Sequence, residues 1–282
     1  MIKGIVLDVD GVIVGETRGL NSPHPHPEVI KYLREVRKSG MPITLCTAKA
    51  VFGIEYEIKE MELKNPHIAD GGSLLVDENV NVLKKCLLDG ETAHKMVRTL
   101  IENDIYVEVY TASNYYIQKN QLCDMTKKHE LVMECLPETV ESLDDFCQGQ
   151  EVTKLAVAVP NEEAVGHAKA VLAEFEDAAT ISWTKHPSIL PIQFAVITAP
   201  NISKRQGVID IAEMLDIPLE NLLGVGDSKS DWQFIELCGY GAAMGNAGED
   251  LKELVRSKGD KGYVGKGVDD NGVIDIIKHF LS

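Results

Sequence analysis

Lys3-Gly-Ile-Val-Leu-Asp-Val-Asp-Gly-Val12 is the stretch that decides the fold. Its apolar run, Ile5 to Leu7, is short and rich in β-branched residues, which predicts a buried parallel strand rather than a helix. Asp8 and Asp10 follow, and residues two apart face the same side of a continuing strand. Two carboxylates this close stay ionised only beside a cation, and hard cations such as Mg²⁺ take oxygen ligands. The stretch therefore predicts a ligand site at the carboxyl end of a strand, where open α/β sheets bind ligands.

Taken alone, Asp-Val-Asp-Gly is as typical of an ordinary turn, because Asp and Gly are common turn residues. Two further stretches contain groups that suit a phosphate. Thr47 follows the apolar strand 42–46 and precedes a helix predicted over 50–62, so its hydroxyl suits a phosphate oxygen or, alternatively, a helix N-cap. Lys204 lies in the first turn of a helix that Ser203 is expected to cap. A cation is unfavourable there unless an anion shares the site, the alternative being an exposed surface lysine.

A fourth stretch, Gly224-Val-Gly-Asp-Ser-Lys-Ser-Asp231, ends the predicted strand 222–226 with more carboxylates. Asp227 and Asp231 are four residues apart, one helical turn, so both can face the same point. Together with Asp8 and Asp10 they predict an oxygen-rich pocket that suits Mg²⁺.

In this order and spacing, the four stretches resemble the motifs of the haloacid dehalogenase-like (HAD) hydrolase superfamily, and most closely its Cof-type phosphatases. Ala243-Met-Gly-Asn-Ala247 matches the Cof-type pattern as well. The resemblance implies an α/β fold, a Rossmann-like core with a central parallel sheet and an inserted α/β cap. We expect residues 1–83 and 191–282 to form the core and residues 84–190 to form the cap.

Within the expected cap, hydrophobic spacing predicts a helix over 91–102 and strands at 105–111, 115–118, 154–159 and 180–184, and a further strand at 192–197 follows the cap. A helix is also expected from 160 to about 175. The acidic region 124–150 is less regular.

The resemblance also implies roles for the residues that match its motifs. Asp8 is the expected nucleophile, which forms an aspartyl-phosphate, and Asp10 the expected general acid and base. The expected phosphate contacts are Gly11, Thr47, Ala48 and Lys204. The expected Mg²⁺ ligands are Asp8, Asp10, Asp227 and Asp231, with Asp231 binding the ion directly or supporting the groups that do.

The chain departs from the family pattern at two places. Thr47-Ala48-Lys49 stands where the family usually has Thr-Gly-Arg, and Lys cannot make the forked contacts of Arg. Asp70-Gly71-Gly72 stands where the Cof-type pattern has Asn-Gly, and here a structural turn is expected. The role of Lys49 is left open by the sequence.

The composition is that of a soluble globular protein, with 44% hydrophobic and 26% charged residues. The chain has 44 acidic and 28 basic residues, and its formal charge is −16. This negative charge argues against nucleic acid or an anionic membrane as a partner. The 6 cysteines show no metal-ligand spacing, which is typical of reduced thiols in a cytoplasmic protein. The first strand leaves no room for a signal peptide, and no apolar run approaches the roughly 18 residues of a membrane helix.

The expected activity is Mg²⁺-dependent hydrolysis of a small phosphorylated metabolite, with a sugar phosphate favoured. A phosphomutase of the same superfamily would share every catalytic group, and a non-catalytic regulatory protein that binds a phosphometabolite is the alternative from another class. The sequence does not indicate the oligomeric state. Candidate substrate contacts are aromatic, although each is more typical of a core or surface position: Tyr115, Tyr116, Trp183, His186 and Trp232.

Overall fold

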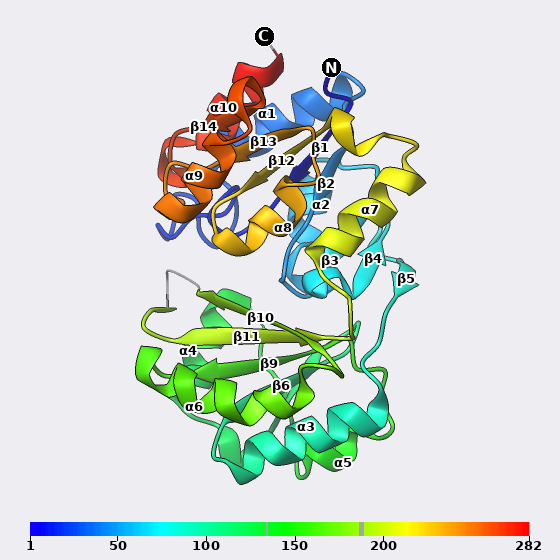
Figure 1. The fold of residues 1–282 in the computed structure, drawn as a ribbon, viewed down its shortest axis with the longest axis vertical. Coiled ribbons are helices and arrows are strands. Elements are labelled where there is room, and N and C mark those ends of the chain that lie inside the picture. Colours follow the sequence, from blue (N-terminus) through cyan, green and yellow to red (C-terminus); the bar gives the residue numbers. More distant parts are fainter. Residues whose placement is uncertain (134, 186–188, 282) are drawn as a thin grey trace.

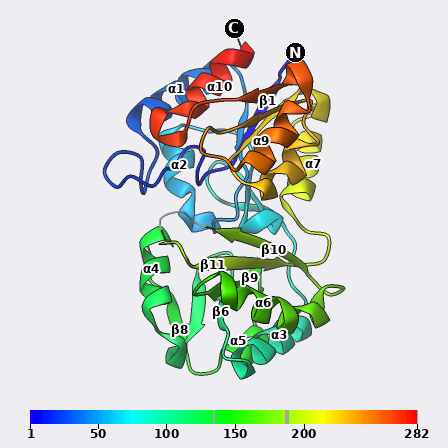
Figure 2. The ribbon, with the colours of Figure 1, turned by 60° about the vertical axis from the view of Figure 1, so that its left-hand side comes forward.

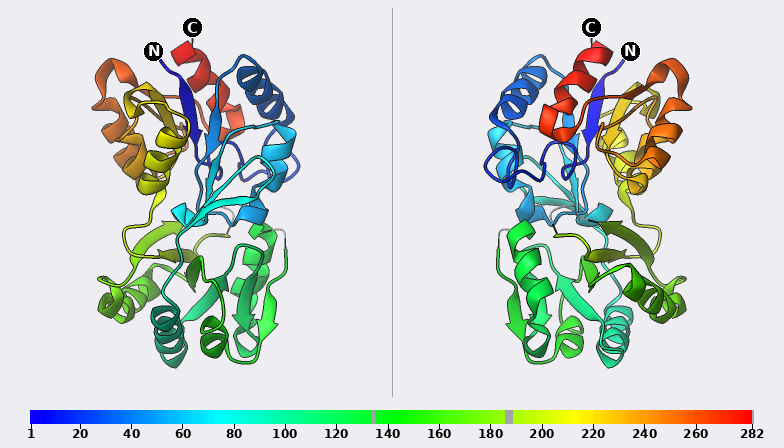
Figure 3. Two further views of the ribbon diagram at one scale, coloured as in Figure 1. Left: turned by 90° about the vertical axis from the view of Figure 1, so that its right-hand side faces the viewer. Right: turned by 90° about the vertical axis from the view of Figure 1, so that its left-hand side faces the viewer.

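The computed structural model describes residues 1–133, 135–185 and 189–281. Figure 1 shows two α/β bodies, one above the other, with both chain termini on the upper one. The lower body is formed by the middle of the chain, and two connections join it to the upper body (Figure 3). The α/β core and the α/β cap expected from the sequence are therefore confirmed.

The core sheet has, among the described residues, five parallel strands in the order β14-β13-β12-β1-β2. β1 lies between β12 and β2, so the strand predicted from the first motif is central. The strands are β1 (Gly4–Leu7), β2 (Ile43–Leu45), β12 (Leu222–Gly226), β13 (Tyr240–Ala243) and β14 (Gly262–Val264).

Helices cover both faces of this sheet, with α1, α2 and α10 on one side and α7 and α9 on the other (Figure 2). Alternate residues of β1 explain this, because Ile5 and Leu7 pack into one apolar cluster while Val6 packs into the other. The core helices are α1 (Pro27–Lys38), α2 (Glu55–Glu60), α7 (Lys204–Met214), α8 (Trp232–Ile235), α9 (Glu249–Arg256) and α10 (Gly272–Leu281). The core is thus three-layered, as in Rossmann-like folds.

A small antiparallel sheet, β3 (His67–Ala69), β4 (Leu74–Val76) and β5 (Val82–Lys85), continues from the core sheet. An isolated parallel bridge between Cys46 and Ile68 joins the two. The turn Asp70–Gly72 lies between β3 and β4, and β5 leads into the cap.

The cap is built on a second sheet, whose described strands run in the order β10-β11-β9-β6-β7-β8. The cap strands are β6 (Tyr106–Tyr110), β7 (Tyr115–Gln118), β8 (Glu138–Val140), β9 (Lys154–Val159), β10 (Thr180–Lys185) and β11 (Gln193–Thr198). The cap helices are α3 (Gly90–Glu102), α4 (Asp124–Met133), α5 (Leu143–Cys147) and α6 (Glu162–Leu172).

The two faces of the cap sheet differ in what covers them. On β9, Leu155, Val157 and Val159 pack with residues of α3, α5 and α6 in one apolar cluster. These helices lie on the side turned away from the core (Figure 1). The alternate residues Lys154 and Ala156 line a pocket together with core residues. Period-two alternation therefore aims one face of the cap sheet at the core.

The structure differs from the sequence-based expectations at two segments. The region 124–150 is more regular than expected, since it contains α4, β8 and α5. The helix expected over 50–62 is a short 3₁₀ turn, Val51–Gly53, followed by α2. In the described residues, no helix has the length and apolarity to cross a membrane.

The expected cap boundaries need adjustment. Residue 84 falls inside β5, which pairs with β4, and residue 190 precedes β11, which pairs with β9 and β10. Cutting at these points would split β5 and would separate β11 from the other strands of the cap sheet. We propose boundaries near residues 86 and 199, at the ends of β5 and β11.

Candidate active site

The carboxylates of the first and fourth motifs meet because β1 and β12 are neighbouring parallel strands. Leu7 pairs with Val225 in the register, so the residues that follow each strand emerge side by side. Oxygens of Asp8, Asp227 and Asp231 all lie within 4.8 Å of one another. Asp10 lines the same pocket as Asp8 and Asp227, so the structure brings the four predicted carboxylates together.

Gly11 has a positional reason to be glycine. Its φ is +76°, and a Cβ there would lie 2.0 Å from Asp227 Oδ2. Its N–H donates to Val14 O at 2.8 Å, so the expected contact between this amide and a phosphate requires that bond to be given up. A contact through the Gly11 amide stays a prediction, whereas the close approach of Asp227 is already present.

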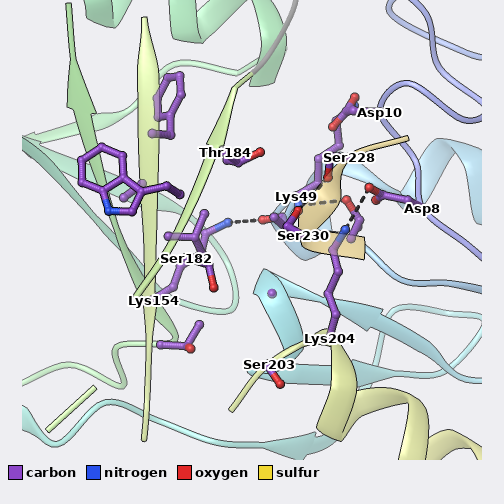
Figure 4. A pocket seen from close by; sticks show the side chains of 18 of the residues that line it. Asp8, Asp10, Lys49, Lys154, Ser182, Thr184, Ser203, Lys204, Ser228 and Ser230 are labelled. Carbon is purple, nitrogen blue, oxygen red and sulfur yellow. Dashed lines mark hydrogen bonds and ion pairs between the residues drawn. The ribbon is translucent and has the colours of Figure 1, made fainter. Parts of the chain in front are cut away.

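Lys204 is buried at the first residue of α7, where the sequence placed it. Its Nζ lies 2.9 Å from Asp8 Oδ2 (Figure 4) and 2.7 Å from Asp231 Oδ1. Burial opposes the charge, but the two carboxylates outweigh it and hold the pKa of Lys204 well above its ordinary value. An exposed surface lysine is thus ruled out. Ser203 begins the helix, although its side chain makes no capping hydrogen bond.

Asp231 is committed to the protein on both of its oxygens. Oδ1 accepts from Lys204, and Oδ2 accepts from the N–H groups of Asp227 and Ser228 at 3.1 and 3.0 Å. Burial raises the pKa of Asp231, but Lys204 and the Ser228 hydrogen bonds outweigh it and lower the pKa below its ordinary value. This arrangement shapes the turn after β12 and positions Lys204.

Burial and neighbouring negative charges act against the ionised forms of Asp8 and Asp227. Burial and the charge of Asp231 raise the pKa of Asp8 to about 7, against the pull of Lys204. Burial and the charges of Asp231 and Asp8 raise the pKa of Asp227 well above its ordinary range. A divalent cation would stabilise the ionised forms of both carboxylates. Closely spaced carboxylate oxygens are also the ligands that a hard cation prefers. The residues present therefore fit a hard metal ion.

Thr47 is buried after β2 and lines the pocket. Its Oγ1 accepts the N–H of Lys49 at 3.1 Å, and its backbone bonds to Ile68 and Gly71 fix it beside the Asp70–Gly72 turn. No group of the described residues accepts the hydroxyl proton, which can therefore be donated to a ligand. Ala48 follows in the same pocket lining, and phosphate binding through it stays a prediction.

Lys49, whose role the sequence left open, forms an ion pair with Asp10 at 3.0 Å between Nζ and Oδ1. The side chains are 10% and 25% exposed, so the pair is partly shielded from water. A lysine here can hold the Asp10 carboxylate without the fork of an arginine.

The cap supplies the opposite wall of the pocket. The sequence did not indicate this contribution, except at Trp183. Among the described residues, Trp183 is the one aromatic candidate that lines the pocket. Tyr115 is fully buried in an apolar cluster, Tyr116 packs on Phe146, and Trp232 packs in the core; His186 lies outside the described residues. The cap residues that were missed include Tyr110, His129, Lys154, Ser182, Thr184 and Phe194.

Besides Trp183, Lys154 is the residue whose sequence context could have indicated this wall, because it is a charged residue that opens an apolar strand. The cap wall is assembled from β6, α4, β9, β10 and β11, which are far apart in the chain. Only the tertiary pairing of these strands reveals it.

Comparison with known proteins agrees with this geometry. The family model described as haloacid dehalogenase-like hydrolase matches residues 5–277. A 5-amino-6-(5-phospho-D-ribitylamino)uracil phosphatase of Bacillus subtilis is 24% identical, covering 100% of this chain and 99% of its own. A phosphoglycolate phosphatase of Methanothermobacter thermautotrophicus is 22% identical over 99% of each chain. The solved phosphatase BT1666 of Bacteroides thetaiotaomicron, 23% identical, superposes with a TM-score of 0.78 over 99% of this chain and 95% of its own.

Proposed function

Because this chain belongs to the haloacid dehalogenase-like hydrolases, we propose that it hydrolyses the phosphomonoester of a small metabolite, with Asp8 as nucleophile. The observation that carries the proposal is the position of Asp8. Its carboxylate ends the central strand, pairs with Lys204, and shares one pocket with Asp10, Thr47 and Asp227. This set provides a nucleophile, an acid and base, and groups for a transferring phosphoryl.

In the first step, an Asp8 oxygen attacks phosphorus and the bond between phosphorus and the alcohol oxygen breaks. Asp10 gives a proton to that oxygen, so the alcohol leaves and an aspartyl-phosphate remains. In the second step, Asp10 takes a proton from water, whose oxygen attacks phosphorus. Inorganic phosphate leaves, and the Asp8 carboxylate is restored. Lys49 keeps the Asp10 carboxylate at the pocket during both transfers.

Charge neutralisation supplies most of the rate in phosphoryl transfer, and this site has two sources for it. Lys204 and the Thr47 hydroxyl bind the non-bridging oxygens. We propose that Asp8 and Asp227 hold Mg²⁺ with the Asp10 backbone carbonyl, while Asp231 positions Lys204 and the turn. Bound there, Mg²⁺ would keep Asp8 ionised and offset the charge of the phosphoryl group.

The named relatives do not fix the substrate of this chain, because their names point to different compounds. A sugar phosphate is the class that the sequence alone favours. A phosphomutase would use the same core groups. The intact set of motif residues supports an enzyme over a regulatory phosphometabolite-binding protein.

The test is phosphate release from a panel of sugar phosphates, nucleotides, phosphoglycolate and cofactor phosphates, with Mg²⁺ and with EDTA. We expect release that requires Mg²⁺. Conversion of a sugar monophosphate to its isomer in the presence of a sugar bisphosphate, with little phosphate released, would favour a mutase. Binding without either reaction would favour the regulatory alternative.

A further inference from the structure

A buried glutamate lies behind the cap wall of the pocket. Glu108 occupies the middle of β6 and is 0% exposed. Val107 and Val109 point into the helix-covered apolar cluster, so Glu108 shares the opposite, core-facing side of the strand with Tyr106 and Tyr110. A carboxylate at such a position requires full hydrogen bonding.

Three donors satisfy it. The hydroxyls of Tyr106 and Tyr110 donate to Glu108 Oε1 and Oε2 at 2.8 and 2.7 Å, and His129 Nδ1 lies 2.8 Å from Oε1. Burial raises the pKa of Glu108, but His129 and the three hydrogen bonds outweigh it, so the pKa is lower than usual. An ionised carboxylate only accepts hydrogen bonds, so Nδ1 carries a proton.

His129 is thereby oriented. It belongs to α4, is 8% exposed, and packs on Phe194 with ring centroids 4.7 Å apart. It also lines the pocket that contains Asp8. Nε2 lies on the ring edge opposite Nδ1, and no group of the described chain binds it. A satisfied core histidine would have both nitrogens engaged, whereas here one is held from behind and the other is left for a ligand.

The rest of the cap wall indicates what that ligand is like. Phe194, Ala156 and Val196 make it largely apolar. Lys154, the other cation of the wall, is already paired with Asp70. Among the described lining residues, the carboxylates come only from the core: Asp8, Asp10 and Asp227. A polyol would leave apolar surface uncovered and would find no carboxylate on this wall for its hydroxyls.

We propose that His129 determines which phosphomonoesters this site accepts, by donating from Nε2–H to an anionic group, such as a carboxylate, on a flat and largely apolar leaving group. The inference rests on the proposed phosphatase function and replaces the sugar phosphate that the sequence favours with this class of leaving group. The donor direction follows from Glu108. Its carboxylate is buried with two tyrosine hydroxyls, and His129 is the partner that can carry a positive charge; when it pairs with Glu108 as a cation, both ring nitrogens carry protons.

The test compares phosphomonoesters that share one ring. The probes are benzyl phosphate, its 3- and 4-carboxy derivatives, and 4-(aminomethyl)benzyl phosphate, with ribose 5-phosphate as the polyol. We expect at least one carboxy isomer to show a KM about 10-fold below that of benzyl phosphate, the size of one charge-assisted hydrogen bond. The aminomethyl compound should be the poorest of the ring series.

Two variants of His129 separate recognition from packing. The side-chain amide of an Asn at position 129 lies near the position of the histidine Nδ1. His129→Asn therefore keeps a donor to Glu108 and removes Nε2. It should abolish the carboxylate preference, so kcat/KM should fall about 10-fold more for the preferred carboxybenzyl phosphate than for benzyl phosphate. Gln places its amide near Nε2, so His129→Gln should restore part of the preference. His167→Asn, the same change at an exposed cap position, is the matched control.

Several results would overturn the proposal. These are equal KM values for benzyl phosphate and both carboxy isomers, a loss of similar size for every substrate in His129→Asn, or a clear preference for ribose 5-phosphate. If no ester is hydrolysed at all, the proposed phosphatase function fails instead. Calorimetric binding of the carboxybenzyl phosphates to the unmodified protein and to His129→Asn then still decides the role of His129.

Discussion

Lys154 Nζ lies 2.9 Å from Asp70 Oδ1, and with side chains 4% and 0% exposed this ion pair is closed to water. It joins β9 of the cap to the turn after β3 of the core. The same ammonium, labelled in Figure 4, donates to Ala48 O at 2.6 Å and lies 4.2 Å from the centre of the Tyr110 ring. With three partners for three N–H bonds, Lys154 is a positioning residue that ties the cap to the Thr47–Ala48 segment.

Removing one partner of this pair should destabilise the protein by about 3–5 kcal/mol, because the other charge is left buried and alone. We expect Lys154→Met and Asp70→Asn each to show that loss by urea denaturation. The double variant should recover most of it, since both charges are gone. The exposed pair Lys85–Glu151, near the same connection, is the control, and breaking it should cost about 0–1 kcal/mol.

The same variants should lower kcat/KM, by up to about 100-fold, because small displacements of catalytic groups are costly. If the pair only stabilised the fold, the double variant would regain full activity along with stability. A double variant that is stable yet slow would show that Lys154 sets the geometry of the Thr47 segment.

Asp227 and Asp231 should respond differently to replacement by Asn. Asp227→Asn removes a carboxylate whose pKa is raised by burial and by like charges, so the metal-free protein should become more stable. Its activity should require far more Mg²⁺. Asp231→Asn breaks the bond to Lys204 and should destabilise the protein with or without metal. Thermal denaturation with EDTA or Mg²⁺ and Mg²⁺ titration of activity measure both; identical behaviour of the two variants would contradict the assignment.

Asp8 and Asp10 should also fail differently. Asp8→Asn removes the nucleophile and should abolish turnover of every substrate. Asp10→Asn loses proton transfer, a loss of about 10²–10⁴-fold. That loss should be smallest for p-nitrophenyl phosphate, whose leaving group needs little protonation. Rates on this ester and on a sugar phosphate, with mass spectrometry of trapped phosphoprotein, decide the roles; covalent phosphate on Asp10 would reverse them.

The sequence predicted the core well because its information is local. Asp8 and Asp227 each follow a short apolar run, and parallel pairing of those runs was enough to bring them together. The unfavourable place of Lys204 at a helix start also indicated that an anion shares its site, and Asp8 and Asp231 lie beside it. Lys49 and Asp70 were seen as departures from a pattern, but their partners, Asp10 and Lys154, were not.

The cap was harder to predict because its wall depends on pairings between distant strands. In the sequence, Glu108 is a single charge within an apolar strand, and His129 lies in the region 124–150 that was expected to be less regular. Their contact joins residues 21 positions apart, and a helix and a strand must both form before it exists. The pattern of apolar residues specifies each element but not which charged side chains meet.

His67, buried in β3, should make the fold sensitive to acid. Its Nδ1 accepts the N–H of Leu45 at 3.1 Å, and burial lowers its pKa to about 3. In the unfolded chain a histidine titrates near 6.5. Between these values the unfolded state binds more protons than the folded state, so the free energy of unfolding falls as the pH falls. Over the range from pH 6.5 to 4, the contribution of His67 is about 3 kcal/mol.

His67→Asn tests this, because the amide oxygen can accept from Leu45 while the titrating ring is gone. The smaller side chain should lower stability at pH 7, as expected for lost core volume. The deficit should shrink or reverse by pH 4, where the wild-type histidine must be kept neutral against protonation. Urea denaturation across this pH range measures both proteins, with His167→Asn as the exposed control. A stability difference that does not change with pH would show that His67 is not held neutral in the folded state.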